Sequence, residues 1–397
     1  MNKNKPAIRF KGFSDAWEQR EFQKLFVERR EKTETEFEDT LLSCAINGMF
    51  LNSELFGHFR GSTTIGYLKV KKNDLILSAQ NLHLGNANVN LRFEHGIISP
   101  AYKVYDIIDC DPKFIQSWVK KEDTKNFFLA ATTEGASQCR KNIEWNTLNK
   151  QNISVPKIDE QKKIGIILEV IDNLITLHQR KYEKLQNVKK SMLEKMFPKN
   201  GSKFPKIRFK GFTDAWEQRK LKNVIIEYKE TVDATCALPV LTSSKTEGVL
   251  LQEEHFGRKQ NHDITGYNIL PRNYCTYRNR SDGVDFTFNI NKCCDKGIIS
   301  KFYPVFYGNN SDIFFISLVL NNSDEVIREI GYTCTGTGQK VLSFLDLQKM
   351  NIRVPSFEEQ RKISSYFEKI DHLITLHQRE LEKLQNIKKS MLEKMFV

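Results

Sequence analysis

Segments of this 397-residue chain occur twice at a constant spacing of 199 residues. The repeated pairs, each differing at one position, are IRFKGFSDAWEQR and IRFKGFTDAWEQR (8–20 and 207–219), IDNLITLHQR and IDHLITLHQR (171–180 and 370–379), and KLQNVKKSMLEKMF and KLQNIKKSMLEKMF (184–197 and 383–396). Self-similarity at a fixed period is typical of a chain built from copies of one structural unit. The sequence therefore predicts two tandem halves, 1–198 and 199–397, joined by a linker at 198–205 that contains Pro, Gly and Lys.

The interior of each half is a diverged copy of the other. ELFG at 54–57 corresponds to EHFG at 254–257, and GIIS occurs at both 96–99 and 297–300. Short apolar or aromatic runs bounded by Gly, Asn and Asp predict strands at 75–79, 284–290 and 301–307, with helices around 112–121 and 312–320. The sequence therefore predicts a strand-rich α+β region in each half, over 1–155 and 199–354.

A long helix is expected at the end of each half, over 156–198 and 355–397. Apolar residues recur there at steps of three and four, Ser356 and Glu359 have the spacing of a capping box, and Asp159 is the expected cap of the first helix. At about 1.5 Å per residue, a helix of about 39 residues spans roughly 58 Å. The predicted seam positions are Ile164, Ile171, His178, Leu185 and Met192 in the first helix and Ile363, Ile370, His377, Leu384 and Met391 in the second.

Helices with one apolar stripe need a partner. The two helices can pair within the chain or between two chains, and we favour an antiparallel coiled coil within the chain. His178 and His377 each occupy an apolar seam position near the middle of a helix, so they should then lie close together. A place at the solvated edge of the seam is favoured over a role as pH sensor or metal ligand.

The net charge of +12 and pI near 9.1 favour a polyanionic partner, with nucleic acid first, a membrane surface second and plain surface solvation as the alternative. Yet residues 21–155 carry 17 Lys and Arg against 17 Asp and Glu, and residues 220–354 carry 16 against 15. No run approaches the roughly 18 apolar residues of a membrane span, and no apolar signal core begins the chain, so a cytoplasmic location is expected. The eight cysteines and eight histidines lack ligand spacing, which predicts reduced thiols and no metal site.

Catalytic motifs are incomplete or missing. Asp111-Pro112-Lys113-Phe114 lacks the second proline of the N/D-P-P-Y/F motif of adenine methyltransferases, and we interpret it as a turn into a helix. TGTGQK at 335–340 does not satisfy G-x-x-x-x-G-K-[S/T], and neither a GxSxG elbow nor an HExxH motif occurs. The sequence therefore predicts a protein without catalytic residues.

The tandem layout, the I-x-V-P-x-x-x-E-Q segments at 153–161 and 352–360, and the two LHQR and KLQNxKKSMLEKMF helices together resemble the specificity subunit of type I restriction–modification systems. The resemblance covers essentially the whole chain. It implies that 1–155 and 199–354 are target recognition domains, each reading one half of a bipartite site in double-stranded DNA, while the helices set the gap.

Chemistry would then belong to other subunits. The resemblance implies two modification subunits that methylate adenine with S-adenosylmethionine and two restriction subunits that use ATP and Mg, with no cofactor on this chain. Two other hypotheses stay open at this point: a self-contained methyltransferase, which would bind S-adenosylmethionine, and a bare structural spacer, which would show no DNA sequence preference.

Two pairs of corresponding segments are candidates for base reading. At an offset of 200, 76–81 aligns with 276–281, so that polar side chains of different identity occupy equivalent positions, as two different half-sites require; Gly-rich segments at 132–140 and 335–340 form the second pair. Ordinary surface loops are the alternative for both. The candidate DNA-binding residues are Ser78, Gln80, Asn81, Arg92, Ser137, Gln138 and Arg140 in the first half and Arg278, Asn279, Arg280, Thr337, Gln339 and Lys340 in the second.

Residues that are identical in both halves cannot distinguish two half-sites. Trp17 and Trp216 are therefore expected to pack against a helix end rather than stack on a base. The repeated lysines at 189, 190 and 195 and at 388, 389 and 394 suit two copies of one partner, with simple solubilising charge as the alternative.

Overall fold

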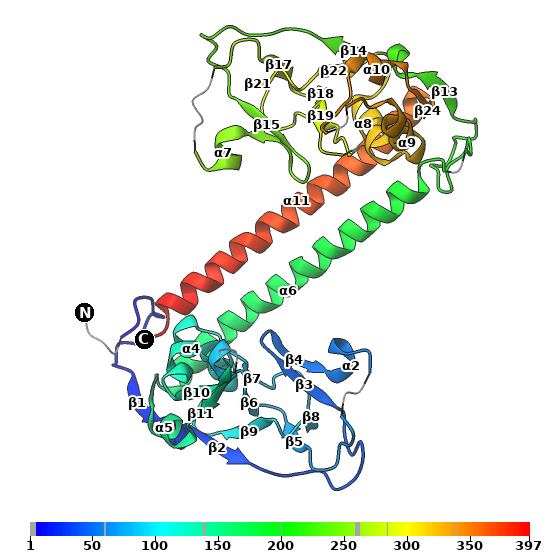
Figure 1. Ribbon diagram of the computed structural model, residues 1–397. Coiled ribbons are helices and arrows are strands. Elements are labelled where there is room, and N and C mark those ends of the chain that lie inside the picture. Colours follow the sequence, from blue (N-terminus) through cyan, green and yellow to red (C-terminus); the bar gives the residue numbers. More distant parts are fainter. Residues whose placement is uncertain are drawn as a thin grey trace. The chain divides into compact units, whose positions relative to one another are not determined.

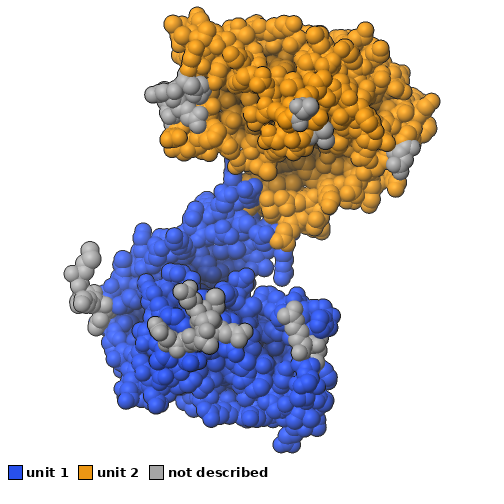
Figure 2. Space-filling model, in the orientation of Figure 1, with its two compact units in different colours: residues 1–180, 378–397 blue, residues 181–377 orange. Residues whose placement is uncertain are grey.

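The computed structural model describes residues 5–58, 61–137, 140–199, 201–258, 263–283, 285–336 and 338–397. It forms two compact units, coloured blue and orange in Figure 2. Unit 1 comprises Met1–Arg180 and Gln378–Val397, and unit 2 comprises Lys181–His377. Figure 1 labels the two long helices, α6 (Ile158–Lys195) and α11 (Phe357–Lys394). Each contributes its first part to one unit and its last part to the other. Each unit thus takes its last helical segment from the other half of the sequence.

Unit 1 is strand-rich and antiparallel. Its elements before α6 are β1 (Glu18–Glu21), α1 (Phe22–Leu25), β2 (Phe26–Arg29), β3 (Leu42–Ala45), β4 (Gly48–Leu51), α2 (Asn52–Leu55), β5 (Leu68–Lys71), β6 (Leu75–Ser78), η1 (Leu82–Leu84), β7 (Ala87–Val89), β8 (His95–Ile98), β9 (Tyr102–Ile107), α3 (Pro112–Val119), α4 (Glu122–Leu129), β10 (Thr132–Ser137), β11 (Arg140–Ile143), α5 (Trp145–Lys150) and β12 (Asn152–Val155). A four-stranded sheet has the order β2-β9-β6-β7, and β1–β12, β3–β4, β5–β8 and β10–β11 form two-stranded pairs. The predicted strand at 75–79 and helix near 112–121 are confirmed as β6 and α3.

Unit 2 repeats this arrangement. Its elements before α11 are β13 (Glu217–Lys220), η2 (Leu221–Asn223), β14 (Ile225–Tyr228), β15 (Leu241–Ser244), β16 (Gly248–Leu251), α7 (Gln252–Phe256), β17 (Asn268–Pro271), β18 (Cys275–Thr276), β19 (Arg280–Ser281), β20 (Asn289–Ile290), β21 (Lys296–Ile299), β22 (Val305–Gly308), α8 (Ile313–Asn322), α9 (Asp324–Thr333), β23 (Lys340–Val341), α10 (Phe344–Lys349) and β24 (Asn351–Val354). The sheet β14-β22-β18-β20 matches the four-stranded sheet of unit 1, and α8 confirms the helix predicted near 312–320. The mixed α+β fold is therefore confirmed in both units.

The strand predicted at 284–290 is shorter in the structure, where β20 covers only Asn289 and Ile290. The Phe288 backbone is bonded to a side chain instead of a neighbouring strand: its N–H donates to Asn321 Oδ1 at 2.9 Å, and its carbonyl accepts from Asn321 Nδ2 at 2.9 Å. Phe288 itself is buried. A side-chain amide on α8 thus replaces the strand partner that an apolar run normally requires.

The long helices begin where the sequence predicts, and the caps differ in detail. The Ser356 hydroxyl accepts a hydrogen bond from the Glu359 N–H at 3.4 Å, as expected for a cap of α11. The prediction for α6 was wrong, because the helix starts at Ile158 and Asp159 lies inside its first turn. No helix among the described residues combines the length and the apolar content of a membrane span.

The predicted antiparallel pairing of the helices is confirmed within each unit. In unit 1, the first part of α6 packs against the last part of α11, and Lys388 Nζ lies 2.5 Å from Asp172 Oδ1. In unit 2, the first part of α11 packs against the last part of α6, and Lys189 Nζ lies 2.6 Å from Asp371 Oδ1. These two repeated lysines therefore contribute to the helix pair itself, while their neighbours Lys190, Lys195, Lys389 and Lys394 are exposed.

Burial follows the predicted seam and is deepest near the start of each helix. Ile164, Ile171, Ile363 and Ile370 are buried; His178, Leu185, Met192, His377, Leu384 and Met391 are half-buried. His178 belongs to unit 1 and His377 to unit 2, so their expected proximity stays a prediction.

Each helix end inserts an aromatic residue into the core of a unit. In unit 1, the Phe396 ring stacks on Phe114 with centroids 5.2 Å apart and meets the Trp17 ring at 6.0 Å. In unit 2, Phe197 lies 5.9 Å from both Phe315 and Trp216. Trp17 and Trp216 are each 2% exposed, which confirms that they pack against a helix end.

Gly165 in α6 makes the closest approach between the long helix and α3. A Cβ built on Gly165 would lie 2.8 Å from Asp111 Oδ1, Lys113 Cβ and the Phe114 backbone nitrogen. Asp111 caps α3, where its carboxylate accepts from the Lys113 and Phe114 N–H groups at 3.0 Å, as the turn into a helix requires. The equivalent Ser364 of α11 has room for a side chain, and its hydroxyl donates to Asp312 Oδ1 at 2.5 Å.

We therefore predict that Gly165→Ala destabilises unit 1 by about 1–3 kcal/mol, since overpacking at a close helix contact forces the backbone apart. Ser364→Ala, the matched change in unit 2, should cost less, about 1 kcal/mol, because only a hydrogen bond is lost. Amide hydrogen exchange of the core of each unit measures both effects. An equal loss in both variants would contradict the tight contact at Gly165.

Candidate nucleic-acid interface

In unit 2, the two candidate reading segments form one surface. β18 is followed by Arg278 and Asn279 and then by β19, which pairs antiparallel with β23 so that Ser281 faces Lys340. The Asn279 carbonyl accepts a hydrogen bond from the Leu342 backbone N–H at 3.0 Å. Because this ladder joins the strand end to the Gly-rich segment, both sets of predicted residues lie side by side.

Three cations on this surface stand apart from the acidic side chains that the structure describes. Arg278 and Arg280 are exposed and Lys340 is half-buried, and none of the three forms an ion pair with a carboxylate in the described part of the chain. By contrast, Arg272 nearby in the sequence is bound to Asp295 at 2.7 Å. Unpaired guanidinium and ammonium groups suit phosphate oxygens and base edges.

The Gly-rich segment of unit 2 is a tight hairpin. Thr335 and Val341 exchange backbone hydrogen bonds of 3.2 and 2.9 Å. Gly336 has a φ of +101°, and a Cβ there would collide with the Gln339 carbonyl oxygen, so glycine is required. Gln339 is exposed, and Thr337 lies outside the described residues. Tyr332, which the sequence analysis did not single out, precedes this hairpin at the end of α9 and is 89% exposed.

The corresponding place in unit 1 shares one backbone hydrogen bond with unit 2, after which the chain turns into η1 in unit 1 and enters β19 in unit 2. The Ala79 N–H donates to the Ala101 carbonyl at 3.4 Å, just as the Asn279 N–H donates to the Phe302 carbonyl at 2.8 Å. Strand registers agree, since Leu75 faces Tyr105 and Cys275 faces Phe306. The offset of 200 that aligns the two sequences therefore also relates equivalent backbone positions, from Leu75 and Cys275 to Ala79 and Asn279.

The exposure of the unit 1 candidates is uneven. Gln80 is exposed and Asn81 is half-buried, so both are accessible. Ser78 is only 6% exposed, and its side chain is therefore not presented to a ligand in this structure.

The second candidate segment of unit 1 is the β10–β11 hairpin. Ser137 and Arg140 are backbone partners in the register of the two strands, and Gln138 lies outside the described residues. Burial and the nearby charge of Lys141 on β11 lower the pKa of the His83 imidazole in η1. Neither residue was predicted, although both lie within two residues of a candidate.

Arg92 is held by a carboxylate. Its guanidinium binds Glu54 through Nη1 at 2.8 Å and Nη2 at 2.6 Å, and it lies 4.7 Å over the Phe93 ring. A bidentate pair satisfies much of the donor capacity that a phosphate would use.

Two asparagines in each unit lie on or just after the strand that pairs with β6 or β18. Asn88 Nδ2 donates to the Ala45 carbonyl at 2.7 Å, and Asn289 Nδ2 donates to the Ser244 carbonyl at 2.8 Å, which anchors the β3–β4 and β15–β16 hairpins. Two positions later, Asn90 Nδ2 donates to the Phe93 carbonyl and Asn291 Nδ2 to the Cys294 carbonyl. The repeated Asn-x-Asn pattern therefore serves the scaffold and not the ligand.

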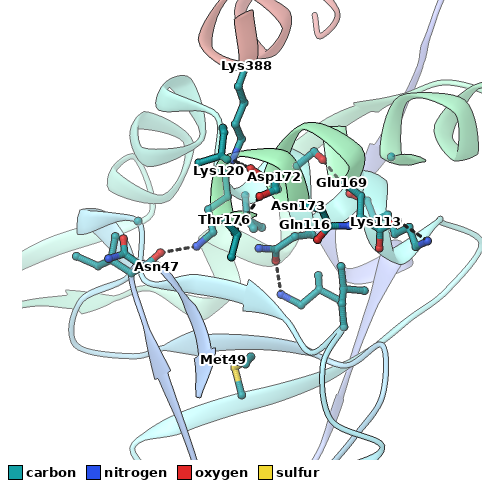
Figure 3. A pocket seen from close by; sticks show the side chains of 18 of the residues that line it. Asn47, Met49, Lys113, Gln116, Lys120, Glu169, Asp172, Asn173, Thr176 and Lys388 are labelled. Atoms are coloured by element: carbon teal, nitrogen blue, oxygen red, sulfur yellow. Dashed lines mark hydrogen bonds and ion pairs between the residues drawn. The ribbon is translucent and has the colours of Figure 1, made fainter. Parts of the chain in front are cut away.

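A groove of about 690 Å³ in unit 1 is lined by residues of α3, α6, β4 and β7 (Figure 3). Most charges on its walls are already paired: Lys113 with Glu169 at 2.7 Å and Lys388 with Asp172 at 2.5 Å. Lys120 Nζ donates to the Ile46 and Ala87 carbonyls at 2.7 and 2.9 Å, and burial lowers the pKa of Lys120 to about 8. This groove presents no free cation array and is not assigned to base reading.

Comparisons with known proteins agree on one family. The model "Type I restriction modification DNA specificity domain" matches twice, over residues 23–187 and 190–386. A putative type I restriction enzyme MjaX specificity subunit of Methanocaldococcus jannaschii is 25% identical over 87% of this chain and 77% of that protein. The MjaVIII specificity subunit of the same organism is 23% identical over 68% of this chain and 66% of that protein.

A crystal structure of a type I restriction–modification S subunit from M. genitalium has the same fold, with a TM-score of 0.60, 12% identity and 99% coverage of both chains. The family model accounts for most of the chain in two copies, which correspond to the two repeated halves. The chain therefore belongs to the type I restriction modification DNA specificity family, as a non-catalytic DNA-recognition subunit that works with other subunits and has no cofactor site of its own.

Proposed function

We propose that the strand-rich regions of units 1 and 2 each read one half of a bipartite site in double-stranded DNA, and that α6 and α11 set the unread gap between the half-sites. The observation that carries this proposal is the equivalent backbone hydrogen bond of Ala79 and Asn279, which is followed by the exposed Gln80 in one unit and the exposed Arg280 in the other. Glutamine suits the N6 and N7 edge of adenine, and arginine suits O6 and N7 of guanine. One scaffold with different polar groups is what two different half-sites require.

The repeated helix surfaces would bind two modification subunits. Lys190, Lys195, Lys389 and Lys394 are exposed and occupy equivalent places in the two halves, so one partner surface fits both. Two restriction subunits would complete the complex, which would act in the cytoplasm, where it has access to DNA. S-adenosylmethionine, ATP and Mg would be bound by those partners.

A duplicated recognition region tests the proposal. In the variant, residues 220–354 are replaced by a second copy of 21–155, and Ser364→Gly is added because the transplanted α3 needs the space that Gly165 provides in unit 1. Two identical readers on an antiparallel helix pair should produce a symmetric bipartite methylation motif. The measurement is a map of N6-methyladenine in cells that express the chain with a matching modification subunit.

The unchanged chain should give an asymmetric bipartite motif with a fixed gap, and cells without the chain should give none. A complex that assembles but yields no chain-dependent motif would contradict base reading and favour a bare structural spacer. An unchanged asymmetric motif from the duplicated variant would show that the strand-rich regions do not choose the half-sites.

A further inference from the structure

A phenylalanine supports the arginine on the reading surface of unit 2. The Arg280 guanidinium lies over the Phe302 ring, 4.3 Å from its centroid, and Lys301 Nζ lies 5.9 Å from the same centroid. Phe302 is exposed, so this ring is not a core residue that Arg280 merely covers. Two cations and one exposed aromatic ring thus gather where the strand end meets the β19–β23 ladder.

The backbone fixes the position of this ring relative to the arginine. The Asn279 N–H donates to the Phe302 carbonyl at 2.8 Å, which holds the residue before Arg280 against the residue that supplies the ring. Arg280 itself is paired with Val341 in the β19–β23 ladder. Both ends of the cation–aromatic contact are therefore anchored to ordered backbone.

Unit 1 lacks this arrangement at the equivalent place. The residue bonded to Ala79 is Ala101, which has no ring, and the exposed side chain that follows is Gln80. The arginine and its ring therefore occur together in one unit and are absent together from the other. An arginine and a ring that occur together in one unit and are both missing from the other are expected if the ring positions the arginine.

We propose that Phe302 is a positioning residue that holds the Arg280 guanidinium edge outward to read one guanine in the half-site of unit 2. Stacking leaves the N–H donors of the guanidinium plane free, and a fixed plane loses less side-chain freedom when it makes the bidentate bond to O6 and N7. The inference rests on the proposed function and adds to it a base identity, a residue and its support.

The test uses the complex of the full chain with modification subunits, and duplexes in which each base pair of the methylated motif is changed in turn. Arg280→Gln should reduce discrimination at one guanine of one half-site by about 5-fold to 150-fold. Phe302→Leu should reduce discrimination at that same guanine by about 2-fold to 5-fold, since an exposed cation–aromatic contact is lost. Phe302→Trp should keep the discrimination of the unchanged chain at that guanine, because the ring is retained. Arg280→Lys should lose it, because lysine lacks the planar pair of donors.

Arg272→Gln is the matched control, because it removes one positive charge from the same unit at an arginine already bound to Asp295. It should weaken binding to all duplexes alike and leave base preference unchanged. Loss of preference in Arg280→Gln without any in Phe302→Leu would overturn the positioning role, and unchanged preference in both would overturn the assignment to guanine. If the unchanged complex itself preferred no half-site, the proposed function would fail instead.

Discussion

Phe396→Ala should lower the free energy of unfolding of unit 1 by about 3–5 kcal/mol, which is the usual cost of removing a large aromatic side chain from a packed core. Phe396 is buried against Phe114 and Trp17, and it reaches unit 1 only through the end of α11. The Ile8 N–H also donates to the Lys394 carbonyl at 2.9 Å, which satisfies one of the last carbonyls of that helix. Hydrogen exchange of core amides in unit 1 measures the loss.

Phe197→Ala is the matched variant for unit 2. Phe197 is buried against Phe315 and Trp216, and the Ile207 N–H donates to the Lys195 carbonyl at the same 2.9 Å. Each variant should therefore loosen mainly the unit that holds the removed ring. If either variant reduced the protection of core amides equally in both units, the two aromatic clusters would not act separately.

Local sequence patterns predicted the long helices and the two packing tryptophans well. The repeats identified Trp17 and Trp216 as packing residues because identical side chains cannot discriminate half-sites, and the structure buries both. The three- and four-residue spacing gave helices that end within a few residues of the observed limits. A helix depends on residues three and four positions apart, so the spacing of apolar residues along the chain predicts it directly.

Long-range pairings escaped the sequence analysis for a physical reason. Arg92 looked like a free cation, yet Glu54 binds it from another element, and Lys189 and Lys388 looked like partner contacts, yet each bonds across the helix pair. Such bonds depend on strand register and helix rotation, which composition does not encode. Phe302 was missed for the same reason, since a long-range hydrogen bond from the Asn279 N–H to the Phe302 carbonyl brings it beside Arg280.

An ion pair with a buried carboxylate occurs in both units, and breaking it should strongly destabilise the unit that holds it. Arg9 Nε and Nη2 bind the two carboxylate oxygens of Glu160 at 2.6 and 2.7 Å, and Glu160 is 1% exposed. Arg208 and Glu359 repeat the bidentate geometry in unit 2 at 2.7 Å for both bonds. Arg9 lies in the IRFKGF segment and Glu160 in the first turn of α6, so the pair fastens the start of the helix to the start of the chain.

Arg9→Met should cost unit 1 about 3–5 kcal/mol, because it leaves a buried carboxylate without a counter-charge. The double variant Arg9→Met with Glu160→Met should recover most of that loss, since well-packed apolar residues of similar volume can replace a buried pair at little net cost. Hydrogen exchange and thermal unfolding measure both, with Arg208→Met as the matched change in unit 2. A double variant as unstable as the single one would show that the segment needs the guanidinium for more than neutralising Glu160, and a single variant without measurable loss would show that water reaches the carboxylate.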